Sequence, residues 1–266
     1  MKQIRISLCI IKMLWKDKVA YPGCLFTDLM MMIARCGVVI LLYANIFKLK
    51  GGTINDTSFQ VAAWSMFLYF IFMTLRLRNV GHMIVQDVKS GSIETMLVKP
   101  MNYIWNRFVW QFGLGLYAFT FSVLMGGALM FLFVGGIPEM TELGFYFSLL
   151  IELLLCTILG LIIFSIVGLF AFWMEDIKPL HAIIDKSIMI LGGSYLPIAL
   201  FPPLLYKVSI WSPFGASQFI THIVYNNWED NFLKMISLQI FWIVLLGLLL
   251  YLIYKRAEKA LTVNGG

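Results

Sequence analysis

Residues 144–173 read GFYFSLLIELLLCTILGLIIFSIVGLFAFW, and Glu152 is the only charged residue among them. An α-helix crosses the hydrocarbon core of a bilayer, which is about 30 Å thick, with about 20 apolar residues. Similar apolar runs lie near residues 22–47, 59–79, 108–134, 183–203 and 234–254. The sequence therefore predicts an all-α polytopic membrane protein with six transmembrane helices.

The composition of the chain agrees with this prediction. Of its residues, 61% are hydrophobic and 13% are charged, and the mean hydropathy is +0.87. A soluble domain carries about 25% charged residues, so an ordinary soluble enzyme is excluded. Six spans leave only short loops, and residues 1–266 are expected to form a single membrane domain. The net charge of +6 lies in short basic clusters between apolar runs. This distribution indicates contact with membrane lipid, not with nucleic acid.

The distribution of basic residues predicts the orientation of the spans. If the N-terminus lies in the cytoplasm, the outer loops hold only Lys48, Lys50, Lys207 and Lys234. All other basic residues outside the spans then lie in cytoplasmic segments, as the positive-inside rule requires. Both termini are therefore expected in the cytoplasm.

Residues 3–18 predict an amphipathic helix before the first span. An apolar stripe of Ile4, Leu8, Ile11 and Trp15 runs beside a basic stripe. Such a helix is typical of segments that lie in the membrane surface. The alternative is the ordinary charged cytoplasmic start of a membrane protein, and the two interpretations are compatible.

The fifth apolar run is interrupted by proline. Residues 192–214 contain Pro197, Pro202, Pro203 and Pro213, and proline removes an amide donor from a helix. We expect a shorter fifth span that leads into broken helices near the outer surface. The alternative is a single kinked span, since neighbouring helices can satisfy the freed backbone groups.

Catalytic and metal-binding motifs are missing from the sequence. There is no G-x-x-x-x-G-K-[ST] phosphate loop, so the chain is not expected to bind ATP by itself. His82, His181 and His222 are expected in separate loops, and this separation argues against a metal site. We expect a protein that is not an enzyme and that carries no cofactor of its own.

The predicted cytoplasmic loop at residues 79–107 has helical signals of its own. Gly91 is placed to cap a short helix, Glu94 lies in its first turn, and Pro100 ends it. One face of this helix is expected to hold Ile93, Met96 and Leu97. The helix either rests on the membrane or its own spans, or inserts into a groove on a cytoplasmic partner.

This loop and several later segments resemble those of a known protein family. The run QDVKSGSIETMLVKPMN at 86–102 is similar to a pattern of the permeases of type-2 ATP-binding-cassette (ABC) transporters, in particular a bacterial branch of uncharacterised transport systems. Further similar runs are GGSYLPIALFPPLL at 192–205, SPF at 212–214 and VNGG at 263–266. The resemblance extends over essentially the whole chain.

The resemblance implies a multi-pass permease subunit, an exporter in a bacterial inner membrane. The loop would be a coupling helix seated in a separate ABC ATPase subunit, present in two copies, which binds ATP and Mg²⁺. The residues of this loop that the resemblance implies for ATPase coupling are Asp87, Gly91, Ile93, Glu94, Leu97 and Pro100. Residues 174–187 would form a lesser contact, and a second permease, dissimilar or identical, would complete the transporter. The alternative is a secondary transporter or channel that acts without an ATPase.

Charged residues within spans are costly and mark candidate functional sites. Three such residues are Asp28 and Arg35 in the first span and Glu152 in the fourth. Arg35 and Glu152 are expected at similar depths, so we predict an ion pair between them, which either holds the spans together or contacts substrate. An Asp28–Arg35 pair along one helix is the alternative.

Overall fold

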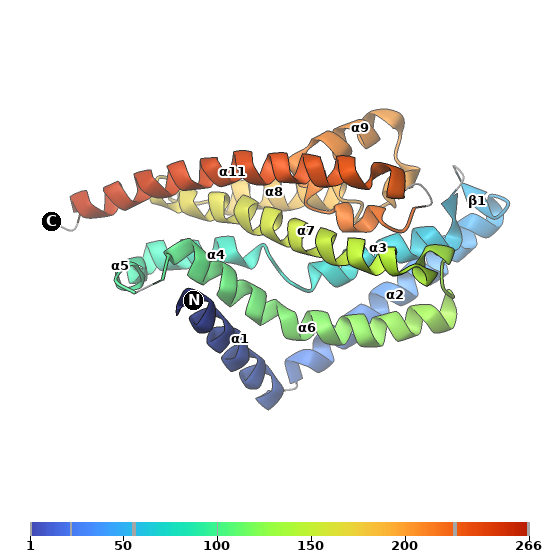
Figure 1. Ribbon diagram of the computed structural model, residues 1–266, viewed down its shortest axis with the longest axis horizontal. Helices are drawn as coiled ribbons and strands as arrows, with labels where there is room; N and C mark the ends of the chain where they lie inside the picture. Colours follow the sequence, from blue (N-terminus) through green and yellow to red (C-terminus); the bar gives the residue numbers. More distant parts are fainter. Residues whose placement is uncertain (1, 22, 55–56, 100, 226–227, 265–266) are drawn as a thin grey trace.

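The computed structural model describes residues 2–264 except 22, 55–56, 100 and 226–227 (Figure 1). Helices dominate the described chain, and the paired strands form one short antiparallel hairpin. The helices are α1 Lys2–Ala20, α2 Gly23–Leu49, α3 Phe59–Met73, α4 Asn79–Ser90, α5 Ser92–Leu97, α6 Tyr103–Phe133, α7 Leu143–Leu169, α8 Lys178–Leu191, α9 Pro203–Trp211, α10 Pro213–Ala216 and α11 Trp228–Asn264. Short 3₁₀ turns are η1 Pro138–Thr141, η2 Phe170–Phe172, η3 Ile198–Leu200 and η4 Phe219–His222, and the strands are β1 Thr53–Ile54 and β2 Thr57–Ser58.

Four helices in the described chain are long and apolar enough to cross a membrane, and they run along the long axis of the molecule (Figure 1). These segments are Phe26–Leu49, Tyr103–Phe133, Leu143–Phe172 and Trp228–Lys259. The prediction of an all-α membrane protein is confirmed. The most apolar window of the third segment is 72% buried and that of the fourth is 11% buried, so α7 is the central helix.

The predicted second span differs from the structure. The sequence predicts this span over 59–79, but α3 ends at Met73, and the chain turns before α4 begins at Asn79. Arg76 in this turn has a φ of 50°, a conformation that is uncommon for residues other than glycine. The freed Leu75 carbonyl accepts a hydrogen bond of 2.9 Å from the Gln111 side chain of α6. The sequence pattern missed this break because residues of a different helix stabilise it.

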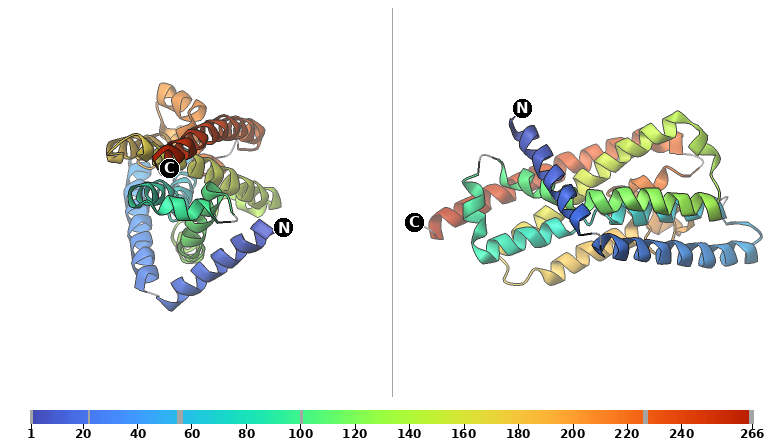
Figure 2. Two further views of the ribbon diagram at one scale, coloured as in Figure 1. Left: turned by 90° about the vertical axis from the view of Figure 1, so that its left-hand side faces the viewer. Right: turned by 90° about the horizontal axis from the view of Figure 1, so that it is seen from below.

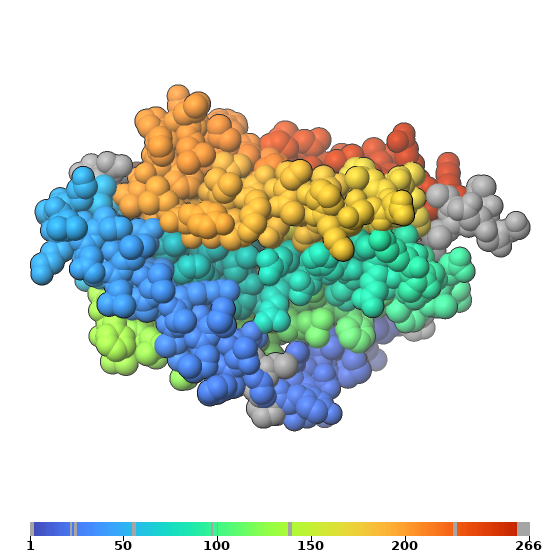
Figure 3. All heavy atoms as spheres, turned by 180° about the vertical axis from the view of Figure 1, so that it is seen from behind, coloured from blue at the N-terminus to red at the C-terminus, as the bar shows by residue number. Residues whose placement is uncertain are grey.

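The fifth run forms the shorter helix and broken segments that its prolines predict. Helix α8 ends at Leu191, and η3, α9, α10 and η4 follow in a series of short pieces. Pro203 and Pro213 each lie in the first turn of a helix, where no amide donor is needed. The alternative of one kinked span is therefore wrong. Seen from behind, α8 and the short segments after it lie above α3 and α4, and α2 lies below them (Figure 3).

Close packing around α7 fixes the position of α4. A β-carbon on Gly81 of α4 would lie 2.8 Å from the Phe164 carbonyl oxygen of α7. A β-carbon on Gly168 of α7 would lie 2.8 Å from the Gly81 carbonyl oxygen. Both distances are too short for a real side chain, so the two backbones approach as closely as they do only because both residues are glycine.

Helix α1 packs obliquely against α6 (Figure 2). Leu14 is buried in this contact, and the Trp15 ring meets the Tyr117 ring edge-on at a centroid distance of 5.1 Å. Ile4 and Leu8 of the predicted apolar stripe remain exposed. This exposure leaves them free for lipid contact, and the position of α1 in the membrane surface stays a prediction.

Candidate functional site

The predicted short helix is present as α5, at the same end of the molecule as the C-terminal end of α11 (Figure 1). Gly91 lies between α4 and α5 with a φ of 70°, and it is the N-cap of α5 as predicted. A β-carbon on Gly91 would meet nothing within 4 Å. The glycine is therefore favoured here by its left-handed backbone and not by lack of space.

The two sides of α5 have different surroundings. Ile93 is only 1% exposed and belongs to the main hydrophobic core, and Met96 packs against that core. Glu94 and Thr95 are exposed, and Val98, directly after the helix, is 87% exposed. The core of this chain covers Ile93, and the part of Ile93 in the coupling stays a prediction. The side chain of Leu97 and all of Pro100 lie outside the described residues.

Asp87 of α4 lies inside the protein instead of on its surface. Tyr103 donates a hydrogen bond of 2.6 Å from its hydroxyl to Asp87 Oδ2. Arg107 Nε lies 2.6 Å from the same oxygen and forms an ion pair with it, and Ser92 donates a hydrogen bond of 3.2 Å to Asp87 Oδ1. The Asp87 oxygens therefore face α5 and α6, and the part of Asp87 in the coupling stays a prediction.

The Asp87 contacts continue into α11. The Tyr103 ring stacks on the Tyr254 ring at a centroid distance of 6.3 Å and an interplanar angle of 5°. The Arg107 guanidinium carbon lies 5.6 Å from the centroid of the Tyr103 ring. No sequence pattern singled out Tyr103 or Arg107 as functional residues, although both follow α5 closely in the sequence. The base of α5 is thus joined by side chains to α6 and α11.

The predicted lesser contact, residues 174–187, lies next to α4. Met174 is exposed, and the side chain of Asp176 accepts a hydrogen bond of 3.0 Å from the Lys178 amide at the start of α8. Asp185 forms an ion pair of 3.4 Å with Arg78, the residue before α4. This segment is therefore tied to the helix that carries α5.

Two of the histidines come together, contrary to expectation. The His82 ring of α4 stacks on the His181 ring of α8 at a centroid distance of 4.0 Å. Burial, and then the neighbouring His181, lower the pKa of His82. Among the described residues there is no cluster of three or more His, Cys, Asp or Glu side chains able to hold a metal ion. The stacked pair thus contributes to the packing of α4 on α8.

The charges within the spans are not arranged as predicted. Asp28 pairs with Arg76 of the turn after α3, and the Arg35 guanidinium lies 5.7 Å from the centroid of the Phe70 ring. Glu152 is fully buried, and Cys156 is its hydrogen-bond partner. Both predicted pairs, Arg35 with Glu152 and Asp28 with Arg35, are wrong in the described structure. The physical reason is that α2 packs against α3 and α6, whereas α7 packs against α4 and α11.

A comparison of the sequence with known protein families identifies the family of this chain. The family described as ABC-2 family transporter protein matches residues 29–265. The match includes most of α2, the α4–α5 segment and all later helices. No curated protein matches the chain. Because the family match covers most of the sequence, the chain belongs to the ABC-2 family of transporter proteins.

Proposed function

We propose that the protein is the permease subunit of an ABC exporter and that α5 is the helix that couples it to a separate ATPase subunit. The observation that carries the proposal is the two-sided nature of α5. Its inner side is anchored through Ile93 and the Asp87 contacts, and its outer side presents Glu94, Thr95 and Val98. A helix anchored on one side and exposed on the other is suited to receive force from a partner.

The transmission of that force follows from the contacts of Asp87. A displacement of α5 acts on α6 through the Asp87–Arg107 pair and the Tyr103 hydrogen bond. It acts on α11 through the stacked rings of Tyr103 and Tyr254. Since α6 and α11 are two of the long apolar helices, force on α5 reaches the membrane-spanning part directly.

The full transporter that we propose has two permease chains, dissimilar or identical, and two ATPase subunits in a bacterial inner membrane. ATP and Mg²⁺ bind to the ATPase subunits, and this chain contributes no catalytic residue. Six crossings with both termini in the cytoplasm follow if α3 and α8 also cross the membrane with the short segments next to them. The end of the molecule with α5 would then face the cytoplasm, and β1–β2 would face outward.

The test of the coupling role is photo-crosslinking from α5. A photoreactive amino acid at position Thr95, in the full chain expressed in its native host, is expected to crosslink to a protein that carries an ATP-binding phosphate loop. The same amino acid at Leu143 is the control, because Leu143 is exposed at the opposite end of the long helices. Crosslinks to such a protein from Leu143 and not from Thr95 would contradict the proposal.

A matched pair of double variants tests the energetic importance of the same surface. Glu94→Lys with Val98→Asp reverses a charge and removes an exposed apolar side chain on the α5 side. Glu142→Lys with Leu143→Asp makes the same kinds of change at the opposite end. Only the first variant is expected to lose association with the ATPase, by about tenfold or more, while membrane insertion persists. Transport by the chain alone in vesicles without an ATPase would overturn the proposal.

A further inference from the structure

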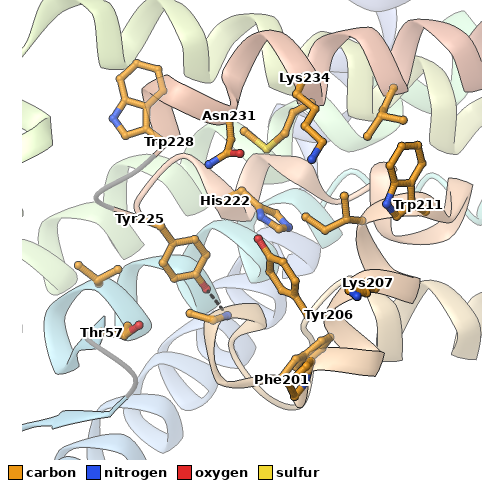
Figure 4. Close-up of a pocket in the computed structure, with 16 residues that line it drawn as sticks. Thr57, Phe201, Tyr206, Lys207, Trp211, His222, Tyr225, Trp228, Asn231 and Lys234 are labelled. Atoms are coloured by element: carbon orange, nitrogen blue, oxygen red, sulfur yellow. Dashed lines mark hydrogen bonds between the residues drawn. The ribbon is translucent and has the colours of Figure 1, made fainter.

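A cavity of about 960 Å³ lies at the end of the molecule opposite α5 (Figure 4). Residues of α9, η4 and the first turns of α11 form most of its wall. Thr57 of β2 and Val61 of α3 close one side. A volume of this size is in the range of small-molecule binding sites in proteins.

Two lysines give this cavity a positive charge. Lys207 of α9 and Lys234 of α11 both line it, and Figure 4 shows them on facing elements. In the part of the chain that the structure describes, neither lysine forms an ion pair with a carboxylate. The Lys234 ammonium lies 5.9 Å from the centroid of the Trp211 ring. Two lysines without acidic partners at one cavity favour an anionic ligand.

His222 adds a polar group without a partner. Its side chain lines the cavity and is only 6% exposed, and its Nε2 atom has no hydrogen-bond partner among the described residues. Burial lowers the pKa of His222 to about 4, so the ring is neutral at pH 7. A buried polar atom without a partner is costly, and a ligand oxygen would remove this cost.

The remaining wall of the cavity is apolar. Phe201, Ile210, Met235 and Leu238 line it together with the ring of Tyr206. The Tyr225 hydroxyl forms a hydrogen bond of 2.9 Å with the Ser65 hydroxyl, so it stabilises the wall of the cavity. The cavity thus combines a charged portion with an apolar one, which is the pattern of an anionic amphiphile.

We propose that this cavity binds the phosphate headgroup of an anionic lipid. Lys207 and Lys234 contact the phosphate, His222 hydrogen-bonds a headgroup oxygen, and the apolar wall receives the first part of an acyl chain. Lysine is a common phosphate-binding residue, and tryptophan and lysine are both typical of the headgroup level of membranes. The inference goes beyond the proposed coupling to an ATPase and does not rest on it, because the site lies wholly within this chain.

The test is a lipid titration of the purified full chain in detergent, followed by native mass spectrometry. The probes are short-chain phosphatidylglycerol, short-chain phosphatidylcholine and inorganic phosphate. Phosphatidylglycerol is expected to bind at least tenfold more tightly than phosphatidylcholine. The Lys207→Gln, Lys234→Gln double variant is expected to lose about tenfold or more of the phosphatidylglycerol affinity, since each lysine contributes to attraction of the anion.

The matched control is Lys48→Gln with Lys50→Gln, which removes the same charge from exposed positions at the C-terminal end of α2. This control is expected to keep the affinity of the unchanged protein. His222→Phe keeps a ring of similar shape and is expected to weaken phosphatidylglycerol binding while both lysines remain. An equal loss in both lysine double variants would overturn the proposal, since it would reflect general surface charge. If inorganic phosphate bound as tightly as phosphatidylglycerol, the claim that the phosphate belongs to a lipid would be overturned. None of these measurements needs an ATPase, so their failure is distinguishable from failure of the coupling role.

Discussion

The two ends of the molecule differ in whether their charged side chains have partners of opposite charge. At the α5 end, Asp87 is buried with Arg107 and Tyr103 as its partners. At the other end, Lys207 and Lys234 line a cavity, and in the described chain they have no carboxylate partner. The buried ion pair makes the junction between the helices stiff. The lysines at the cavity have no carboxylate partner in the described chain, so they are available to bind an anionic ligand. The first end is suited to transmit force, and the second is suited to bind.

The largest expected effect comes from the buried pair at the α5 end. Asp87→Asn leaves the Arg107 charge buried without a counter-charge, and the free energy of unfolding should fall by about 3–5 kcal/mol. Asp185→Asn is the matched control, because the Arg78 side chain of its ion pair is 47% exposed and stays solvated without its partner, and its cost should be below about 1 kcal/mol. Lys207→Gln at the cavity should change stability by less than about 0.5 kcal/mol.

Denaturation in detergent, followed by circular dichroism, measures all three variants. A loss in Asp87→Asn no larger than that in Asp185→Asn would contradict the stiff junction. The contrast between the two ends would then rest on the cavity alone.

The second effect is a pH dependence located at the cavity end. The pKa of His222 is lowered from 6.5 to about 4 in the folded protein, because burial disfavours the charged ring. Between these values the unfolded chain binds more protons than the folded one, so stability falls as the pH falls from 7 toward 4. The loss assigned to His222 should reach about 3 kcal/mol at pH 4.

The measurement is the difference between the unchanged protein and His222→Phe, unfolded at pH 7 and at pH 4.5. The variant lacks the titrating ring, so its stability should fall less over this interval. Equal falls in both proteins would show that His222 is not buried as a neutral ring.

The smallest effect concerns the contact of α4 with α7. Gly81→Ala forces a β-carbon against the Phe164 carbonyl oxygen, and the free energy of unfolding should fall by about 1–3 kcal/mol. Gly127→Ala in α6 is the matched control, because a β-carbon there meets nothing within 4 Å. The control should be neutral or stabilising by about 0.5–1 kcal/mol.

This prediction also separates the two ends. Gly81→Ala should weaken ATPase association, since it shifts the helix that carries α5, and should leave phosphatidylglycerol binding at the cavity unchanged. Co-purification of the ATPase with this variant and the lipid titration of the purified chain check the two parts, and thermal unfolding measures the loss of stability. Loss of lipid binding in this variant would show that the two ends are coupled through the bundle.

By itself, the sequence determined the class of the protein and much of its local structure. Long apolar runs predict the long helices because the bilayer sets their length, and Gly91 predicts the start of α5 because its backbone preference is local. Prolines predict the broken segments after α8 because the effect of proline acts on its own helix.

The tertiary structure alone decided the partners of the charged residues and the existence of the cavity. Asp87 faces Arg107, and Glu152 lies apart from Arg35, because helix packing chooses which faces meet. The cavity draws its wall from residues between Thr57 and Leu238, which no sequence period connects. The spacing of apolar residues along a segment predicts the secondary structure of that segment. Contacts between distant segments depend instead on how the helices pack, which is decided only when the whole chain has folded.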